Sequence, residues 1–337
     1  MLRCGLLKEG LRTRYLFLFL LLSSSSGCHI LVGLGEPAPE AAVQELPQLE
    51  ETSPDDDGPP LPGMASRRRA DRIVAYRYSR LKSNTGINTN TAIAPGEGQF
   101  VYRTQLRFME SHSNPRPANV DLNMLVNPHL LAYGVRENLT LIGFVPIVVR
   151  EGTARPPSSP GAFGSLAEQG VADLRFLGKY RFWRKDLPGE TYRWSAIGGL
   201  EVPTYDNPFS SDSWDPFLGT VWTYQSLEWG LDLDAVWKFN TGDGKFRHDA
   251  LSYNLAYTYV LLAGQDLDDK FWRLGSVFEL NSLYVADGSH LVYASPGIQL
   301  ALERMIVEAS LQLPIVRDLK KAAEPDFTFV VGTRITW

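Results

Sequence analysis

Charged side chains with alternate spacing are the residues of this sequence that could do chemistry. They recur at every second position of segments whose other positions are apolar. Such charges can line a pore and set its preference for solutes, and pairs of opposite sign can equally bridge neighbouring strands and fill a lumen. Both interpretations remain open from the sequence. The candidate pore-lining residues are Arg103, Arg107, Asp121, Asp173, Arg175, Lys179, Arg181, Arg193, Glu201, Asp232, Asp234, Lys238, Arg273, Glu279, Glu308 and Arg334.

The patterns of known catalytic and metal sites are missing from the sequence. It contains no Gly-x-Ser-x-Gly run, and no histidine has the spacing of a zinc site or of a nucleophile's base. We therefore expect no catalytic residue, no metal and no cofactor. His112, His248 and His290 would lie near the outer rim of a barrel, so a hydrolase with a rim site is the enzyme alternative.

The elements that must position these charges are β-strands, because the apolar residues repeat with a period of two. Trp229, Leu231 and Leu233, for example, alternate with Gly230, Asp232 and Asp234. Most of these segments are long enough for a spanning strand, which needs about 9–11 residues. The predicted strands are 99–112, 119–134, 138–151, 170–184, 191–204, 215–225, 228–240, 249–262, 270–284, 289–302, 305–316 and 326–337.

The composition favours a membrane barrel over a soluble one. Mean hydropathy is −0.15 and aromatic residues make up 11 % of the chain, and no apolar run reaches the roughly 18 residues of a spanning helix. Twelve strands enclose more space than apolar side chains alone would fill, so the charged faces are expected to line a wet interior. The sequence predicts an all-β fold, a closed antiparallel transmembrane barrel of about twelve strands in the outer membrane of a Gram-negative-type bacterium. The longer connections, 152–169 and 205–214, are expected to lie outside and to gate the lumen.

Residues 1–27 have the order of zones that is typical of an export signal. A basic start is followed by the apolar run Tyr15–Leu22 and then by small residues. Cys28 stands directly after this segment. Its thiol could take a diacylglycerol group, and ordinary cleavage nearby is the other interpretation.

Three further regions follow the signal. Residues 28–71 are predicted to be a disordered acidic linker rich in proline, because they carry too little apolar surface to offset their ordering entropy. Residues 72–98 give no clear pattern, and residues 99–337 form the barrel. Gly332 and the terminal Trp337, at the end of an alternating strand, are interpreted as the signal for the barrel-insertion machinery.

Several short blocks resemble the outer-membrane family labelled MetA-pathway of phenol degradation. They are Gly170–Leu174 with Gly178–Phe182, Gly198–Thr204, Ser252–Tyr257, Ser295–Gln299 and Glu308–Pro314. The resemblance covers roughly residues 100–337. It implies a transporter-like barrel that passes aromatic or other small organic compounds.

The sequence thus leads to a ranked set of functional hypotheses. The first is an outer-membrane channel or transporter for small organic solutes. The second is a structural or interaction barrel with a filled lumen and an N-terminal arm in the periplasm, and the third is the rim-site hydrolase. The expected partners are outer-membrane lipid and the insertion machinery. A formal charge of −5 gives no reason to expect nucleic acid.

Overall fold

The computed structural model describes residues 85–112, 120–154, 164–205, 207–242, 248–265, 270–320 and 324–337. Within these ranges no helix has the length and apolarity of a membrane span. The predicted signal peptide, Cys28 and the acidic linker lie outside the described residues. The strands are β1 Phe100–His112, β2 Val120–Arg136, β3 Leu139–Ala154, β4 Gly164–Val171, β5 Leu174–Leu187, β6 Glu190–Val202, β7 Asp215–Ser226, β8 Trp229–Lys238, β9 Ala250–Gln265, β10 Phe271–Val285, β11 His290–Ala301, β12 Met305–Asp318 and β13 Glu324–Thr336.

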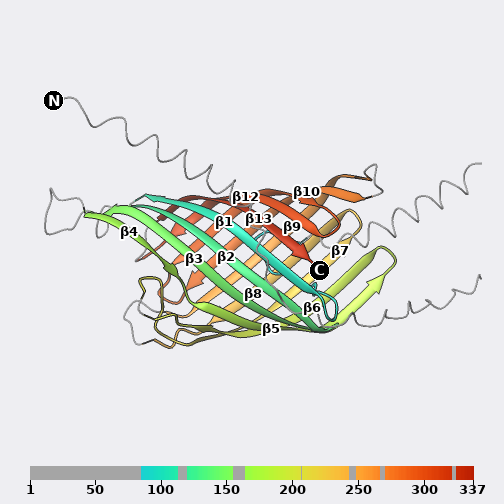
Figure 1. The fold of residues 1–337 in the computed structure, drawn as a ribbon, viewed down its shortest axis with the longest axis horizontal. Helices are drawn as coiled ribbons and strands as arrows, with labels where there is room; N and C mark the ends of the chain where they lie inside the picture. Colours follow the sequence, from blue (N-terminus) through green and yellow to red (C-terminus); the bar gives the residue numbers. More distant parts are fainter. Residues whose placement is uncertain are drawn as a thin grey trace, which may run out of the picture. The chain divides into compact units, whose positions relative to one another are not determined.

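The strands form one closed sheet (Figure 1). Each strand is antiparallel to its neighbours, β1 pairs with both β2 and the last strand β13, and the pairing of β2 with β3 completes the ring. Closure leaves no sheet edge whose N–H and C=O groups would be bare in hydrocarbon. The predicted closed antiparallel barrel is confirmed.

β4 and β5 share one position in the ring. β4 pairs with the Ile147–Ala154 part of β3, and β5 pairs with the Leu139–Phe144 part of the same strand. The N–H of Ala172, at the break between them, donates to the carbonyl of Pro146 at 2.9 Å. The thirteen segments therefore make a barrel of twelve strands, the number predicted.

The predicted outer loop 152–169 is wrong in its extent. β3 continues to Ala154, and β4 begins at Gly164, where the two strands still pair in register. This hairpin extends beyond the pairing of β3 with β5. The pairing of β3 with β4 is made by backbone hydrogen bonds. The alternation of side chains in the sequence does not show where such pairing ends.

The two faces of the sheet have opposite polarity, and their order is that of a membrane protein. Leu218 and Phe176 point outward and are 61 % and 55 % exposed, whereas Glu279 and Asp232 point inward and are 0 % and 1 % exposed. A soluble barrel would bury the leucines and expose the acids. Apolar outside and polar inside is the distribution of an outer-membrane barrel, as the sequence predicts.

Candidate functional site

Residues 85–93, called the lumen segment below, lie inside the barrel ahead of β1. Thr85, Ile87, Thr89 and Ala92 are each less than 5 % exposed. At one end of the segment, the side chain of Gln299 on β11 donates to the carbonyl of Thr85 at 2.9 Å. At the other end, Lys179 on β5 reaches the carbonyls of Thr91 and Ile93. Since β11 and β5 lie far apart around the ring, the segment crosses the lumen.

Inward carboxylates hold the backbone of this segment. Glu279 accepts hydrogen bonds from the N–H groups of Asn88 and Thr89, each at 2.9 Å, and from the side-chain amide of Asn88 at 2.7 Å. Asp232 accepts from the N–H of Gly86 at 3.3 Å, and Asp234 accepts from the N–H of Asn90 at 2.7 Å. Hydrogen bonds to ionised acceptors are roughly twice as strong as neutral ones. The acidic residues of β8 and β10 thus act as a cradle for the segment.

Gly86 fits this cradle because it has no side chain. A Cβ atom at this position would lie 2.5 Å from Oε1 of Glu279 and 2.8 Å from the Cβ atom of Ala256. Both distances are shorter than a van der Waals contact. Close passage of the backbone past Glu279 therefore requires glycine at residue 86.

A second set of contacts surrounds Glu308 on β12, which is 1 % exposed. Arg103 on β1 donates to it at 2.9 Å, Gln105 at 2.9 Å and Arg334 on β13 at 3.4 Å. Arg103 and Gln105 also donate to the carbonyl of Ile87. Glu308 therefore couples the closing pair of strands to the lumen segment.

The lumen segment leaves the barrel at the end where β1 begins. The N–H of Gly98 donates to the carbonyl of Gly134 at 2.8 Å. Phe100 and the terminal Trp337 exchange two backbone hydrogen bonds, at 2.9 and 3.1 Å, and their rings stack with centroids 6.3 Å apart. The start of the barrel and the end of the chain thus share one rim.

The opposite end of the lumen carries a cluster of paired charges. Glu201 accepts from Arg175 at 2.6 Å and from Lys238 at 3.2 Å, and Lys238 lies 3.9 Å from Asp215. Asp173, at the break between β4 and β5, accepts from the N–H groups of two residues in the loop 203–214. The contact with Ser211 fastens the predicted gating loop 205–214 to the barrel wall, and the contact with Thr204 fixes the residue just before it.

Replacing Asp173 by alanine is expected to loosen the loop 203–214. The change removes hydrogen bonds to Thr204 and Ser211, each worth about 1.5–3 kcal/mol with a charged acceptor. Limited proteolysis with chymotrypsin should cut after the exposed Tyr205 at least tenfold faster than in the parent. Asp212→Asn, an exposed change in the same loop, is the matched control. Equal cleavage rates in all three proteins would contradict this role of Asp173.

The structure places nearly all of the predicted pore-lining residues on the inward face or, for Asp173, at the break in the wall. Asp121 is the exception. Its neighbour Asn123 pairs with Glu110, which lies on the outward face together with Phe108, and Asp121 itself is exposed. The prediction is wrong there because it assumed that the polar residues of every strand face inward. On β2 the inward residues are apolar, and the polar residues near Asp121 face outward.

The lumen segment and several uncharged ligands of the inward acids were not predicted from the sequence. Thr223 on β7 donates to Asp232 and accepts from the N–H of Ala92 at 2.8 Å, and Gln105 and Gln299 bind Glu308. One signal could have pointed to the segment. Half of residues 85–94 are threonine or asparagine and none is charged, between more highly charged flanks, a composition that suits a narrow interior lined with acids.

The histidines do not assemble a catalytic group in the part of the chain that is described. Nδ1 of His129 lies 2.6 Å from the hydroxyl of Tyr102, and Nε2 of His290 lies 2.7 Å from the hydroxyl of Tyr253. The side chain of His112 lies outside the described residues. The described residues also contain no group of three or more His, Cys, Asp or Glu side chains that could hold a metal.

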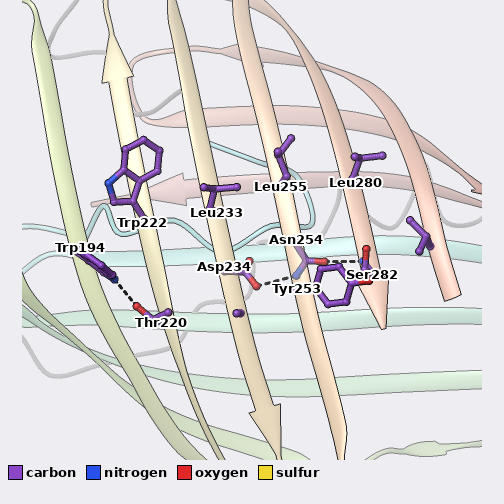
Figure 2. Close-up of a pocket in the computed structure, with 12 residues that line it drawn as sticks. Trp194, Thr220, Trp222, Leu233, Asp234, Tyr253, Asn254, Leu255, Leu280 and Ser282 are labelled. Carbon is purple, nitrogen blue, oxygen red and sulfur yellow. Dashed lines mark hydrogen bonds between the residues drawn. The ribbon is translucent and has the colours of Figure 1, made fainter. Parts of the chain in front are cut away.

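A hollow of about 530 Å³ lies on the outward wall over β6 to β11. Trp194, Trp222 and Leu233 are among the large side chains around it, and Trp194 donates to Thr220 at 2.5 Å (Figure 2). Because the residues around it are mostly outward and apolar, the hollow faces the hydrocarbon rather than the lumen.

A row of hydrogen bonds links three neighbouring strands, β8, β9 and β10, beside this hollow. Figure 2 shows Asn254 between Asp234 and Ser282, donating to the first at 2.9 Å and accepting from the N–H of the second at 3.2 Å. Asp234 also binds Asn90 of the lumen segment. The cradle acid is therefore itself fixed by the barrel wall.

Comparison with known proteins gives one family and a group of solved barrels. A family model described as "Putative MetA-pathway of phenol degradation" matches residues 117–313. The COG4313 outer membrane channel from Pseudomonas putida F1 is 15 % identical, with a TM-score of 0.48 over 76 % of this chain and 100 % of that chain. The CymD monoaromatic hydrocarbon channel is 11 % identical, with a TM-score of 0.36 over 72 % of this chain and 89 % of that one. A Pseudomonas aeruginosa FadL homologue is 12 % identical, with a TM-score of 0.31 over 71 % and 75 % of the two chains. No curated protein sequence matches significantly.

Proposed function

The chain belongs to the MetA-pathway of phenol degradation family, whose model covers more than half of it, and from this premise we propose that it is an outer-membrane channel for small organic solutes. The proposal concerns passage through the lumen rather than chemistry on the solute. The inward charged residues named above are its candidate lining.

The proposal rests on one observation: the segment that fills the lumen is held there mainly by polar contacts. The lumen segment is held mainly by hydrogen bonds to inward polar groups. Its apolar contacts form two small clusters: Ile87 packs with Val277 and Val330, and Ala92 packs with Ile197 and Val221, against which Leu177 and Phe217 also lie. Water can take over hydrogen bonds of this kind, at a net cost of about 1.5–3 kcal/mol each when one partner is charged. A segment held in this way can shift to let a solute pass.

The same segment supports a second candidate, the structural barrel with a filled lumen. Thr85, Ile87, Thr89 and Ala92 are as buried as core residues of a soluble protein. In that case the segment would stay in place permanently and the barrel would not conduct.

Reconstitution of the full-length purified protein in planar bilayers separates the two candidates. We expect discrete single-channel steps whose conductance fluctuates as the lumen segment moves. Protein from the same preparation, unfolded by boiling before addition, is the control and should give no steps. Complete absence of current from protein that migrates as a folded barrel on unheated gels would reject the channel and support the structural barrel.

A further inference from the structure

With the lumen segment in place, the inward acidic side chains of the described strands all have hydrogen-bond or ion-pair partners, whereas several inward arginines have no acidic partner. Each inward carboxylate of the described strands is engaged: Asp232, Asp234 and Glu279 bind the lumen segment, and Glu201 and Glu308 bind cations. The inward acids nearer the outer rim are also paired, Glu168 with Arg150 and Asp326 with Arg317. An arriving solute therefore finds the acidic side chains already occupied.

Several inward arginines lack an acidic partner. Within the described part of the chain, Arg107 donates only to Oε1 of Gln105, at 2.6 and 3.0 Å. Arg193 donates only to the hydroxyl of Thr191, at 3.2 Å. Arg273 is 7 % exposed and makes no hydrogen bond or ion pair to any described residue. These guanidinium groups would hold an anion without first breaking an ion pair.

These arginines lie on both sides of the lumen segment along the barrel axis. On β1, Arg103 and Gln105 touch the segment at Ile87, and Arg107 is the next inward residue toward the outer end. Arg273, near the start of β10, and Arg193, near the start of β6, lie toward the opposite rim. A solute that enters from outside therefore meets Arg107 before it meets the segment.

The wall beside Arg107 is apolar, unlike the inward faces of the other strands. Arg107 pairs across the sheet with Val126 of β2, and Val126 pairs with the buried Val148 of β3. Further along β3, Phe144 lies under the guanidinium of Arg175, 5.6 Å from its ring centroid. A cation next to an apolar surface suits a molecule that has a charged end and an apolar body.

We propose that the passage takes small organic anions with an apolar ring, the class of aromatic carboxylates, and that Arg107 is the first residue to bind their carboxylate. This rests on the proposed channel function and names its substrate class. The planar guanidinium can donate two parallel hydrogen bonds to a carboxylate. The ring then lies against the apolar faces of β2 and β3, and the arginines beyond the segment receive the anion next.

Two recordings on the full-length protein in planar bilayers test this proposal. In a KCl gradient, the reversal potential should show preference for chloride. With benzoate as the probe, current blockades should appear that benzamide, which has nearly the same shape without the charge, does not produce. In Arg107→Gln the dwell time of the benzoate blockades should fall roughly tenfold, as expected for the loss of a charge-assisted pair.

Arg107→Lys keeps the positive charge and should keep the preference for chloride. Arg304→Gln changes an exposed arginine in the turn between β11 and β12 and should behave as the parent. A conducting parent that prefers potassium, or that responds equally to benzoate and benzamide, would overturn the proposal and leave the channel function standing. The comparison of the two probes on the parent decides the matter even if Arg107→Gln fails to fold. A folded parent without any current would overturn both.

Discussion

Glu279→Leu is expected to convert the barrel to a state of higher conductance. The leucine removes three hydrogen bonds that hold Asn88 and Thr89 and leaves their N–H groups without an acceptor. Each bond to a charged acceptor is worth about 1.5–3 kcal/mol. The balance between seated and displaced segment should shift by at least about 4 kcal/mol, which is roughly a thousandfold.

Single-channel recording checks this expectation. The mean conductance of Glu279→Leu should approach that of a protein from which residues 85–93 are deleted, and both should exceed the parent severalfold. Glu228→Leu, a change of an exposed acid in the turn between β7 and β8, should leave the conductance unchanged. If the deletion conducted no better than the parent, the lumen segment would not be what restricts the passage.

Glu308→Leu is expected to destabilise the barrel itself. The change leaves the guanidinium groups of Arg103 and Arg334 without their carboxylate partner, although they are only 19 % and 12 % exposed. Removing one member of a buried ion pair costs about 3–5 kcal/mol, because the remaining charge is uncompensated. The folded band on unheated gels should therefore be lost at a clearly lower temperature than in the parent. Glu303→Leu, an exposed acid in the preceding turn, is the control.

A triple variant shows whether charge is the cause. If both arginines are changed to methionine in the Glu308→Leu background, the charge that Glu308 compensated is gone, and much of the thermal stability should return. Replacing a whole buried ion network by apolar groups is often neutral. A triple variant as unstable as Glu308→Leu would point to lost packing or lost contacts with the lumen segment instead of charge.

The strands could be predicted because every second side chain meets lipid. Residues 228–240 were predicted as a strand, and β8 covers Trp229–Lys238. The same rule could not show β4, whose pairing with β3 extends beyond the ring through backbone hydrogen bonds and the Arg150–Glu168 ion pair. It also placed Asp121 on the wrong face. On β2 the inward residues are apolar, and the outward residues near the outer end of the strand, such as Asp121 and Asn123, are polar.

The candidate site could be predicted only in part. Alternation identified the inward charges, yet it carries no information about their partners. Asn88 and Glu279 are 191 residues apart in sequence, and residues 85–93 have no period of their own. A charged residue that lines an open pore and one that binds a filling segment therefore look alike in the sequence.

The short connection between the lumen segment and β1 has a consequence for how fast the passage recloses. Residues 94–99 tie the segment to the rim at Gly134, so a displaced segment stays at millimolar effective concentration near its cradle. Rebinding is then an intramolecular step that needs no separate closing protein. Each opening is expected to end by itself, and its duration is set by the chain's own tether.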